Sequence, residues 1–326
     1  MGIQSEEELN KAYKFLEEGN PSKAKRIIAD AIEFDLENQE LNFAYWCCSF
    51  WDEFIKNLPQ QDAMEQGENL IARWEAFSET LERGKQIIPR AVFAVQHGVF
   101  TLALNAFSKM QTQLDRQASN MKNMLARAEI YRKEGLCCKK IGQYEEALSF
   151  LMQANSYSPS SAPVLAEMAD CFALCGEEKK AKVLFREAFF IDAQKIAISF
   201  LESELIRRLI EQVKLKGYSG AALLEWIPVY GVLYGIFNIK RELRPQEANR
   251  LKQDVYALEN ELKDPKNDPN ILKPKIINMY FWLIDYYSRA CVNIGYEAEA
   301  TNRQNIDECL LQIRVHDENI YDMYIR

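Results

Sequence analysis

Apolar and polar positions along the chain recur with a helical spacing and, over part of the chain, with a longer period of 34 residues. The segments 128–161 and 162–195 align without a gap, and residues of the same kind recur at matching places. The matching pairs are Gly142 and Gly176, Ala147 and Ala181, Leu151 and Phe185, and Ala154 and Ala188. A period of this length predicts units that cannot bury their apolar face alone and therefore stack on one another.

Each unit is predicted to consist of two antiparallel helices. Gly142 and Gly176 would end the first helix, because glycine adopts a left-handed backbone at little cost. The small Ala147 and Ala181 would let the second helix cross the first closely. Pro159 would stop the second helix of its unit, since proline cannot continue the hydrogen-bond ladder.

Two weaker copies of this unit are predicted nearer the amino terminus. Segment 5–38 carries Gly19, Ala24, Ile28 and Ala31 at matching positions, and segment 84–117 carries Gly98, Ala103, Phe107 and Met110. The intervening segment 39–83 does not keep the period, and we interpret it as a degenerate repeat with a lengthened turn around Leu58 and Pro59. The repeat array is therefore predicted to span 1–195.

The period fades after residue 195, but helical periodicity continues, so 196–326 is predicted to form a helical module that packs on the array or caps it. Gly220–Ile239 is almost wholly apolar and close to the roughly 20 residues that cross a bilayer. Glu225 and Pro228 interrupt it, which favours a buried hairpin helix over a membrane span. The 13 Gly and 10 Pro are too few for the many turns of a β-fold. The expected fold class is therefore all-α.

The repeats resemble the tetratricopeptide repeat (TPR) family. In 128–161 the matching residues are Gly135, Gly142, Tyr144, Ala147, Leu151, Ala154 and Pro159, with Tyr131 near the signature aromatic position. Two departures are Glu134, where the family usually has leucine, and Ala193, where the next unit lacks the terminal proline. The resemblance implies an α-solenoid of helix-turn-helix repeats, whose first helices line a concave groove that binds peptides.

Carrying the groove positions over gives eight candidate residues for partner binding. They are Glu129, Arg132, Lys133, Leu136, Lys139 and Lys140 in the first unit, and Glu167 and Asp170 in the second. One face would be basic and the next acidic, a pattern that could hold a charged peptide. The alternative is that these are ordinary solvated helix faces. The residues with which some family members clamp a chaperone's terminal carboxylate are not reproduced, because Leu136 and Glu167 stand at the asparagine positions.

Charge and cysteine usage narrow the functional classes. The net charge is −8 and no run of Lys and Arg exceeds two residues, so nucleic-acid binding is not expected. Of the eight cysteines, four form adjacent pairs within apolar helical patterns, which suits a reducing compartment better than a disulfide framework. The first eight residues show neither the basic nor the apolar region of a signal peptide. We expect a cytoplasmic protein without a membrane span.

Motifs for catalysis are missing from the sequence. It contains no nucleophile elbow and no glycine-rich phosphate loop, so we expect no enzymatic activity, no catalytic residues and no cofactor. Cys137, Cys171 and Cys175 could approach a soft metal, but small thiols in tight core positions are the favoured interpretation. The expected function is a non-enzymatic adaptor that binds a protein or peptide in the groove. The alternative is a peptide or small-ligand sensor with an aromatic pocket between the repeats and the carboxy-terminal module, suggested by the aromatic stretches 226–237 and 280–287.

Overall fold

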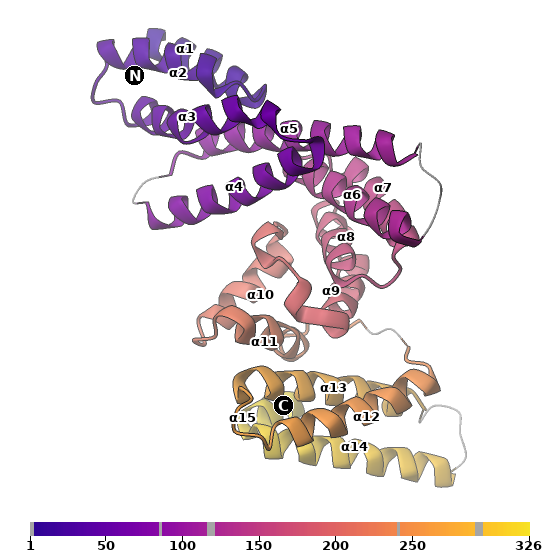
Figure 1. Ribbon diagram of the computed structural model, residues 1–326. Coiled ribbons are helices and arrows are strands. Elements are labelled where there is room, and N and C mark those ends of the chain that lie inside the picture. Colours follow the sequence, from indigo (N-terminus) through magenta and orange to yellow (C-terminus); the bar gives the residue numbers. More distant parts are fainter. Residues whose placement is uncertain (1–2, 85–86, 116–120, 240–241, 291–295) are drawn as a thin grey trace. The chain divides into compact units, whose positions relative to one another are not determined.

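A computed structural model of the chain describes residues 3–84, 87–115, 121–239, 242–290 and 296–326. Within these ranges the regular structure consists of fifteen α-helices and three short 3₁₀ turns, and no strand occurs (Figure 1). The predicted all-α class is confirmed. The chain divides into two compact units, Met1–Pro159 and Ser160–Arg326.

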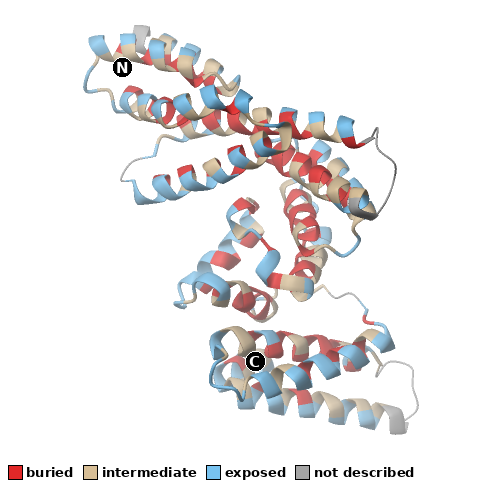
Figure 2. Cartoon of the chain, viewed as in Figure 1, coloured by how far each residue is buried: buried red, intermediate tan, exposed pale blue. Residues whose placement is uncertain are grey.

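In the part of the first unit that the structure describes, one long helix contacts most of the others. The helices are α1 (Ile3–Glu17), α2 (Pro21–Phe34), α3 (Gln39–Asn57), η1 (Leu58–Gln60), α4 (Ala63–Arg83), α5 (Pro89–Asp115), α6 (Met121–Lys140) and α7 (Tyr144–Tyr157). Helix α5 packs against α1, α3, α4 and α6. Its middle section is buried for this reason (Figure 2).

The same glycine turn joins two helices at three places in the chain. It links α1 to α2 at Gly19, α6 to α7 at Gly142, and α8 (Ala162–Leu174) to α9 (Glu178–Asp192) at Gly176. These glycines have φ of 72°, 85° and 81°. Each donates its N–H to the carbonyl three residues earlier, and the next residue donates to the carbonyl five residues earlier. This is the Schellman arrangement, and it confirms the predicted left-handed helix ends at Gly142 and Gly176.

The residues that follow these turns occupy equivalent buried positions. Five residues after each glycine an alanine, Ala24, Ala147 or Ala181, is fully buried. Four residues further on, Ile28, Leu151 and Phe185 are fully buried as well. The small residue comes first because the second helix must lie close to the first near the turn, and the larger one fills the space where the helices diverge.

The prediction of a helical hairpin at 84–117 is wrong. Helix α5 runs without interruption from Pro89 to Asp115 and passes straight through Gly98. Gly98 lies where α5 crosses the end of α1, and a methyl group there would sit 1.9 Å from the carbonyl oxygen of Leu16. Its neighbour His97 places Nδ1 3.3 Å from the carbonyl oxygen of Glu17. The glycine therefore serves a close helix crossing and not a turn.

The aromatic segment of 39–83 forms the core between α3, α4 and α5. Trp51 and Phe77 are almost fully buried, and the rings of Trp74 and Phe100 meet edge to face with centroids 5.4 Å apart. Arg73 covers this cluster, with its guanidinium 4.0 Å from the centre of the Phe50 ring. Helices α3 and α4 form a helix-turn-helix pair whose turn is the 3₁₀ segment at Leu58–Gln60, where a lengthened turn was predicted.

The second unit begins with the hairpin α8–α9 and continues through six further α-helices in its described residues. The six helices are α10 (Glu204–Lys214), α11 (Gly220–Leu233), α12 (Pro245–Glu261), α13 (Pro269–Ala290), α14 (Tyr296–His316) and α15 (Glu318–Ile325), and two 3₁₀ turns, η2 (Ala193–Lys195) and η3 (Ile198–Phe200), precede them. The division into compact units falls at 159/160, whereas the sequence suggested a boundary at 195/196. The reason is that α9 and η2 pack on α11, so the second predicted repeat belongs with the carboxy-terminal helices.

A buried ion pair ties α9 to α13 within this unit. Arg186 and Asp285 are 2% and 5% exposed, and Nη2 of Arg186 donates a hydrogen bond to the Asp285 carboxylate. The guanidinium also lies 4.6 Å from the centre of the Trp282 ring, which in turn contacts Phe190. A charge this deeply buried requires its partner, because the unpaired ion has lost its hydration without compensation.

Two apolar helices bear on the question of membrane spans. The stretch expected to be a buried hairpin helix forms α11, which at 14 residues is short, and its Glu225 is buried and accepts from Gln194 at 2.8 Å. Burial raises the pKa of Glu225. Among the described residues one helix, Pro89–Leu114 within α5, is long and apolar enough to cross a membrane, and half of its apolar window is buried in the fold. A core helix of a folded protein has the same length and composition.

The two uses of glycine predict different costs of substitution. We expect Gly98→Ala to lower the free energy of unfolding by more than about 3 kcal/mol, because the added methyl group meets backbone that cannot move aside. Gly142→Ala should cost about 1 kcal/mol, since its Cβ would point into open space and only the left-handed backbone is strained. Urea unfolding followed by circular dichroism measures both. Equal losses would contradict the assignment of Gly98 to a crossing.

Candidate functional site

Five of the eight groove candidates are buried, which corrects the expectation that they line an open groove. Leu136, Lys139 and Lys140 on α6 and Glu167 and Asp170 on α8 are all less than 9% exposed. On α6 the cause is its neighbours, because α5 and α7 pack on it from two sides. The main chain of Lys140 is part of this packing, since its carbonyl accepts a hydrogen bond from Gln96 of α5 at 2.7 Å.

Asp170 has a structural role inside the second unit. Its carboxylate accepts hydrogen bonds from the backbone N–H groups of Glu202 and Ser203, both at 2.8 Å. Ser203 is the residue before the first turn of α10, where backbone N–H groups lack partners within the helix. Asp170 thus caps the start of α10, whose N-cap residue Ser203 lies 33 residues later in the chain.

Glu129, Arg132 and Lys133 remain partly exposed, but they bind one another. Arg132 donates through Nε to Glu129 Oε2 at 2.9 Å, and Lys133 donates to Glu68 of α4 at 2.9 Å. Burial alone would raise the pKa of Glu129, but the hydrogen bond from Arg132 and the charges of Arg132 and Lys133 outweigh it and hold the pKa below its usual range. These three residues form a local ion-pair cluster on α6, and their role in partner binding stays a prediction.

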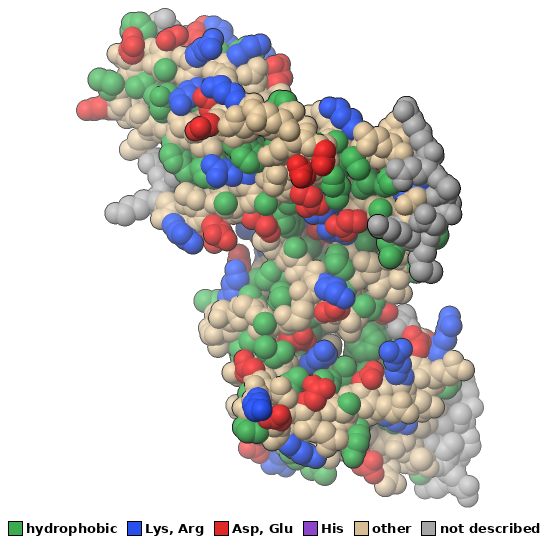
Figure 3. Space-filling view, viewed as in Figure 1, with side chains coloured by type: hydrophobic (Ala, Val, Ile, Leu, Met, Phe, Trp, Pro, Cys, Tyr) green, Lys and Arg blue, Asp and Glu red, His purple; other side chains and the backbone are tan. Residues whose placement is uncertain are grey.

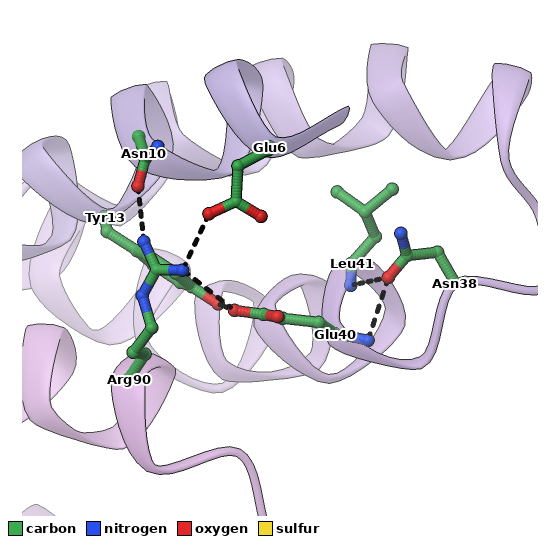
Figure 4. A network of polar contacts seen from close by, with 7 residues as sticks. All are labelled: Glu6, Asn10, Tyr13, Asn38, Glu40, Leu41 and Arg90. Atoms are coloured by element: carbon green, nitrogen blue, oxygen red, sulfur yellow. Dashed lines mark hydrogen bonds and ion pairs between the residues drawn. The ribbon is translucent and has the colours of Figure 1, made fainter. Parts of the chain in front are cut away.

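A second polar network joins α1, α3 and α5 around Arg90 (Figure 4). Arg90 Nη1 lies 3.0 Å from Glu6 Oε1 and 3.9 Å from Glu40 Oε1, and Nη2 donates to Asn10. The hydroxyl of Tyr13 donates to Glu40 at 2.7 Å, and the Arg90 guanidinium lies 5.2 Å from the centre of the Tyr13 ring. Burial, and after it the hydrogen bond to Glu40, raises the pKa of Tyr13 well above its ordinary value. The hydroxyl therefore stays protonated and remains a donor.

Local sequence places each member of this network. Glu6, Asn10 and Tyr13 recur at helical spacing on one face of α1. Asn38 caps α3 by accepting from the backbone N–H groups of Glu40 and Leu41, as Figure 4 shows, which holds Glu40 in the first turn. Arg90 follows Pro89 at the start of α5. The result is an arginine held by partners on two other helices.

Beside this network lies a surface cavity of about 680 Å³ between α1 and α5. Its lining residues come from one face of each helix: Asn10, Tyr13, Lys14, Glu17, Pro89, Arg90 and Phe93. Phe93 is 56% exposed, although it is a large apolar side chain. We refer to this cavity as the α1–α5 pocket. It combines an exposed aromatic ring with charged residues of both signs, which are the components that hold an apolar anchor in one orientation.

Sequence reasoning missed the α1–α5 pocket because its two walls are about eighty residues apart in the chain. The repeat alignment placed 84–117 in a hairpin and so separated Phe93 and Arg90 from α1. One signal was present: Phe93 has polar residues at helical spacing on both sides, Arg90 three positions before it and His97 four positions after it. Such a residue becomes recognisable only when the helix is known to be continuous.

No metal site emerges from the described residues, where no group of three or more His, Cys, Asp or Glu side chains could hold an ion. Cys137, Cys171 and Cys175, the three thiols considered for a soft metal, are not disulfide-bonded, and the first two are buried. The burial of Cys137 and Cys171 agrees with their favoured interpretation as small core residues, whereas Cys175 is exposed and does not fit it.

Comparison with known proteins adds no family or relative. No protein-family model matches the sequence, and no curated protein matches it significantly.

The network around Arg90 predicts a specific role for one hydroxyl. We expect Tyr13→Phe to lower the free energy of unfolding by about 1 kcal/mol, because the part-buried Glu40 carboxylate loses its closest donor. Tyr45→Phe on α3 is the matched control, since Tyr45 is exposed. Urea unfolding of both variants measures the difference. If the two variants lost the same amount, the hydroxyl of Tyr13 would have no role in holding the network.

Thiol accessibility gives a second prediction. Cys175 is exposed, and we expect an aromatic disulfide reagent to label it in the native state within minutes. The buried thiols should react far more slowly, because burial raises the pKa of Cys48, Cys138 and Cys309 to about 12 and few thiolates form. Mass spectrometry of peptides after timed labelling measures each site. Rapid labelling of Cys48 would show that the α2–α3 packing opens in solution.

Proposed function

We propose that this protein is a non-enzymatic adaptor of TPR-like helical repeats that binds a partner protein or peptide. The observation that carries the proposal is the recurrence of one hairpin unit at Gly19, Gly142 and Gly176, with the same backbone hydrogen bonds and the same buried alanine. Repeated hairpins of this kind stack into arrays whose surfaces serve as binding faces. The cytoplasm is the proposed location, supported by the absence of disulfides among the described cysteines.

The binding site we propose is the α1–α5 pocket. Five of the eight residues predicted to line a groove of the repeats are buried. The α1–α5 pocket, in contrast, has an exposed apolar ring and a cavity large enough for a side chain of a partner. The fixed network around Arg90 and Tyr13 would give this site a rigid wall, which lowers the entropy lost on binding. Lys14 and Glu17 at its rim would select the partner's charge.

Surface charge supports a protein partner over a nucleic acid. On the face drawn in Figure 3, positive and negative side chains are interspersed, with apolar side chains between them. On this face no basic surface for a phosphate backbone is visible among the described residues, and the net charge of −8 also disfavours binding to one. A mixed surface with an apolar anchor is typical of protein recognition.

The test is a pull-down with the tagged full chain from a lysate of its own organism, with bound proteins identified by mass spectrometry. The Phe93→Glu variant should lose at least about tenfold of a partner enriched by the unchanged chain, because it places an uncompensated charge in the apolar centre of the site. Phe34→Glu is the control: Phe34 is 84% exposed and lies outside the pocket. Circular dichroism establishes that both variants fold.

Two outcomes count against this proposal. Equal retention of every partner by both variants would remove the α1–α5 pocket as the binding site. Enrichment of no protein at all, together with a co-purified small molecule in a native mass spectrum, would favour a ligand sensor in place of the adaptor.

A further inference from the structure

Three helices of the second unit line an open surface cavity that the proposed function does not use. Helices α12 and α14 both pack on α13, and between them lies a cavity of about 410 Å³. Its apolar lining includes Val255 of α12, Leu283 of α13, and Cys309 and Leu311 of α14. This volume lies in the range of small-ligand sites, and we call it the α12–α14 cavity.

Aromatic rings line this cavity. Tyr280 and Tyr287 of α13 are buried, and Tyr256 of α12 is 69% exposed. One of these rings already makes a cation–π contact, because Lys252 Nζ lies 5.2 Å from the centre of the Tyr287 ring. The negative face of an aromatic ring attracts a cation in this position.

At the other end the cavity contains a carboxylate that two neighbours hold in place. Glu259 Oε1 accepts from the Tyr280 hydroxyl at 2.6 Å and lies 3.3 Å from His316 Nε2. Both contacts use the same oxygen, and Oε2 has no hydrogen bond to any described residue. Burial and the bond to Glu259 raise the pKa of Tyr280, which keeps its hydroxyl protonated. The Glu259 carboxylate is therefore fixed in orientation, and its Oε2 can accept a hydrogen bond from a ligand.

The charges of the lining favour a positive ligand. Glu308 of α14 adds a second carboxylate, so Glu259 and Glu308 outnumber Lys252. Lys252 is seven residues from Glu259 on α12, which separates them by roughly 10 Å along the helix axis. Lys252 therefore does not neutralise Glu259, and a second cation can bind beside Glu259 and Tyr280.

We propose that the α12–α14 cavity binds an organic cation, an alkylguanidinium or alkylammonium group. Its charged head would pair with Glu259 Oε2 against the ring of Tyr280, and its alkyl chain would lie on Val255 and Leu283. A charge-assisted hydrogen bond and a ring face recognise such a group together. This site is independent of the α1–α5 pocket.

The experiment titrates the full chain with butylguanidinium and, separately, with butylurea, its uncharged isostere, using isothermal titration calorimetry. We expect butylguanidinium to bind with a dissociation constant of the order of 1 mM, as befits a ligand of so few atoms. Butylurea should bind at least about tenfold more weakly, because it lacks the charge that Glu259 recognises. Equal binding of the two would overturn the proposal.

Variants assign the binding to this cavity. Glu259→Gln should weaken butylguanidinium binding about tenfold, as expected for the loss of a charged hydrogen-bond partner. Glu261→Gln removes the same charge from an exposed position two residues away on α12 and should leave binding unchanged. Thermal unfolding of both variants checks their fold. Equal affinity of the Glu259→Gln variant and the unchanged chain would place the ligand elsewhere and overturn the assignment.

One further titration distinguishes a free small cation from an arginine side chain of a partner protein. A capped peptide, acetyl-Ala-Arg-Ala-amide, presents the same guanidinium on a backbone. Tighter binding of this peptide than of butylguanidinium would assign the site to an arginine side chain of a partner protein. Weaker binding would assign it to a free small cation.

Discussion

The packing of this protein depends on points where a residue without a large side chain lets a neighbouring helix come close, with its backbone at Gly98 and with a side chain at Gly67 and Gly135. A methyl group on Gly98 would meet the main chain of α1, one on Gly67 would meet the ring of Phe107, and one on Gly135 would meet Leu151. Fully buried alanines play the same part beside the three glycine turns. Because interiors are closely packed and the backbone that faces Gly98 cannot move aside, these contacts fix the spacing and the crossing of the helices.

The sequence indicates much of the helical structure because its strongest signals are local. Glycine at a left-handed helix end and alanine at the following close contact recur with a fixed spacing, and both were placed correctly at Gly142 and Gly176. Gly98 was misassigned for a physical reason: a turn and a helix crossing both require a residue without Cβ, and a single sequence does not separate the two. The spacing of Ala103 and Phe107 after it then imitated a second helix.

The functional surface was harder to predict because exposure is not a local property. Lys139, Lys140 and Asp170 have the side chains of solvated positions, yet they are buried, and Asp170 satisfies the start of a helix far along the chain. The two cavities combine residues from helices that are separated in sequence, Tyr13 with Phe93 and Glu259 with Tyr280. Each owes its character to an aromatic ring beside a fixed charge, so the candidate sites follow from packing and not from a motif.

The ion pair between Arg186 and Asp285 has a consequence for how the chain can be divided. It links residues 99 positions apart, so the hairpin α8–α9 and the helix α13 share one desolvated charge. A fragment ending after residue 195 would retain the guanidinium and lose its carboxylate, which leaves a cation without hydration or partner. Separate expression of the two halves should therefore cut near residue 159, where the chain divides into its two compact units.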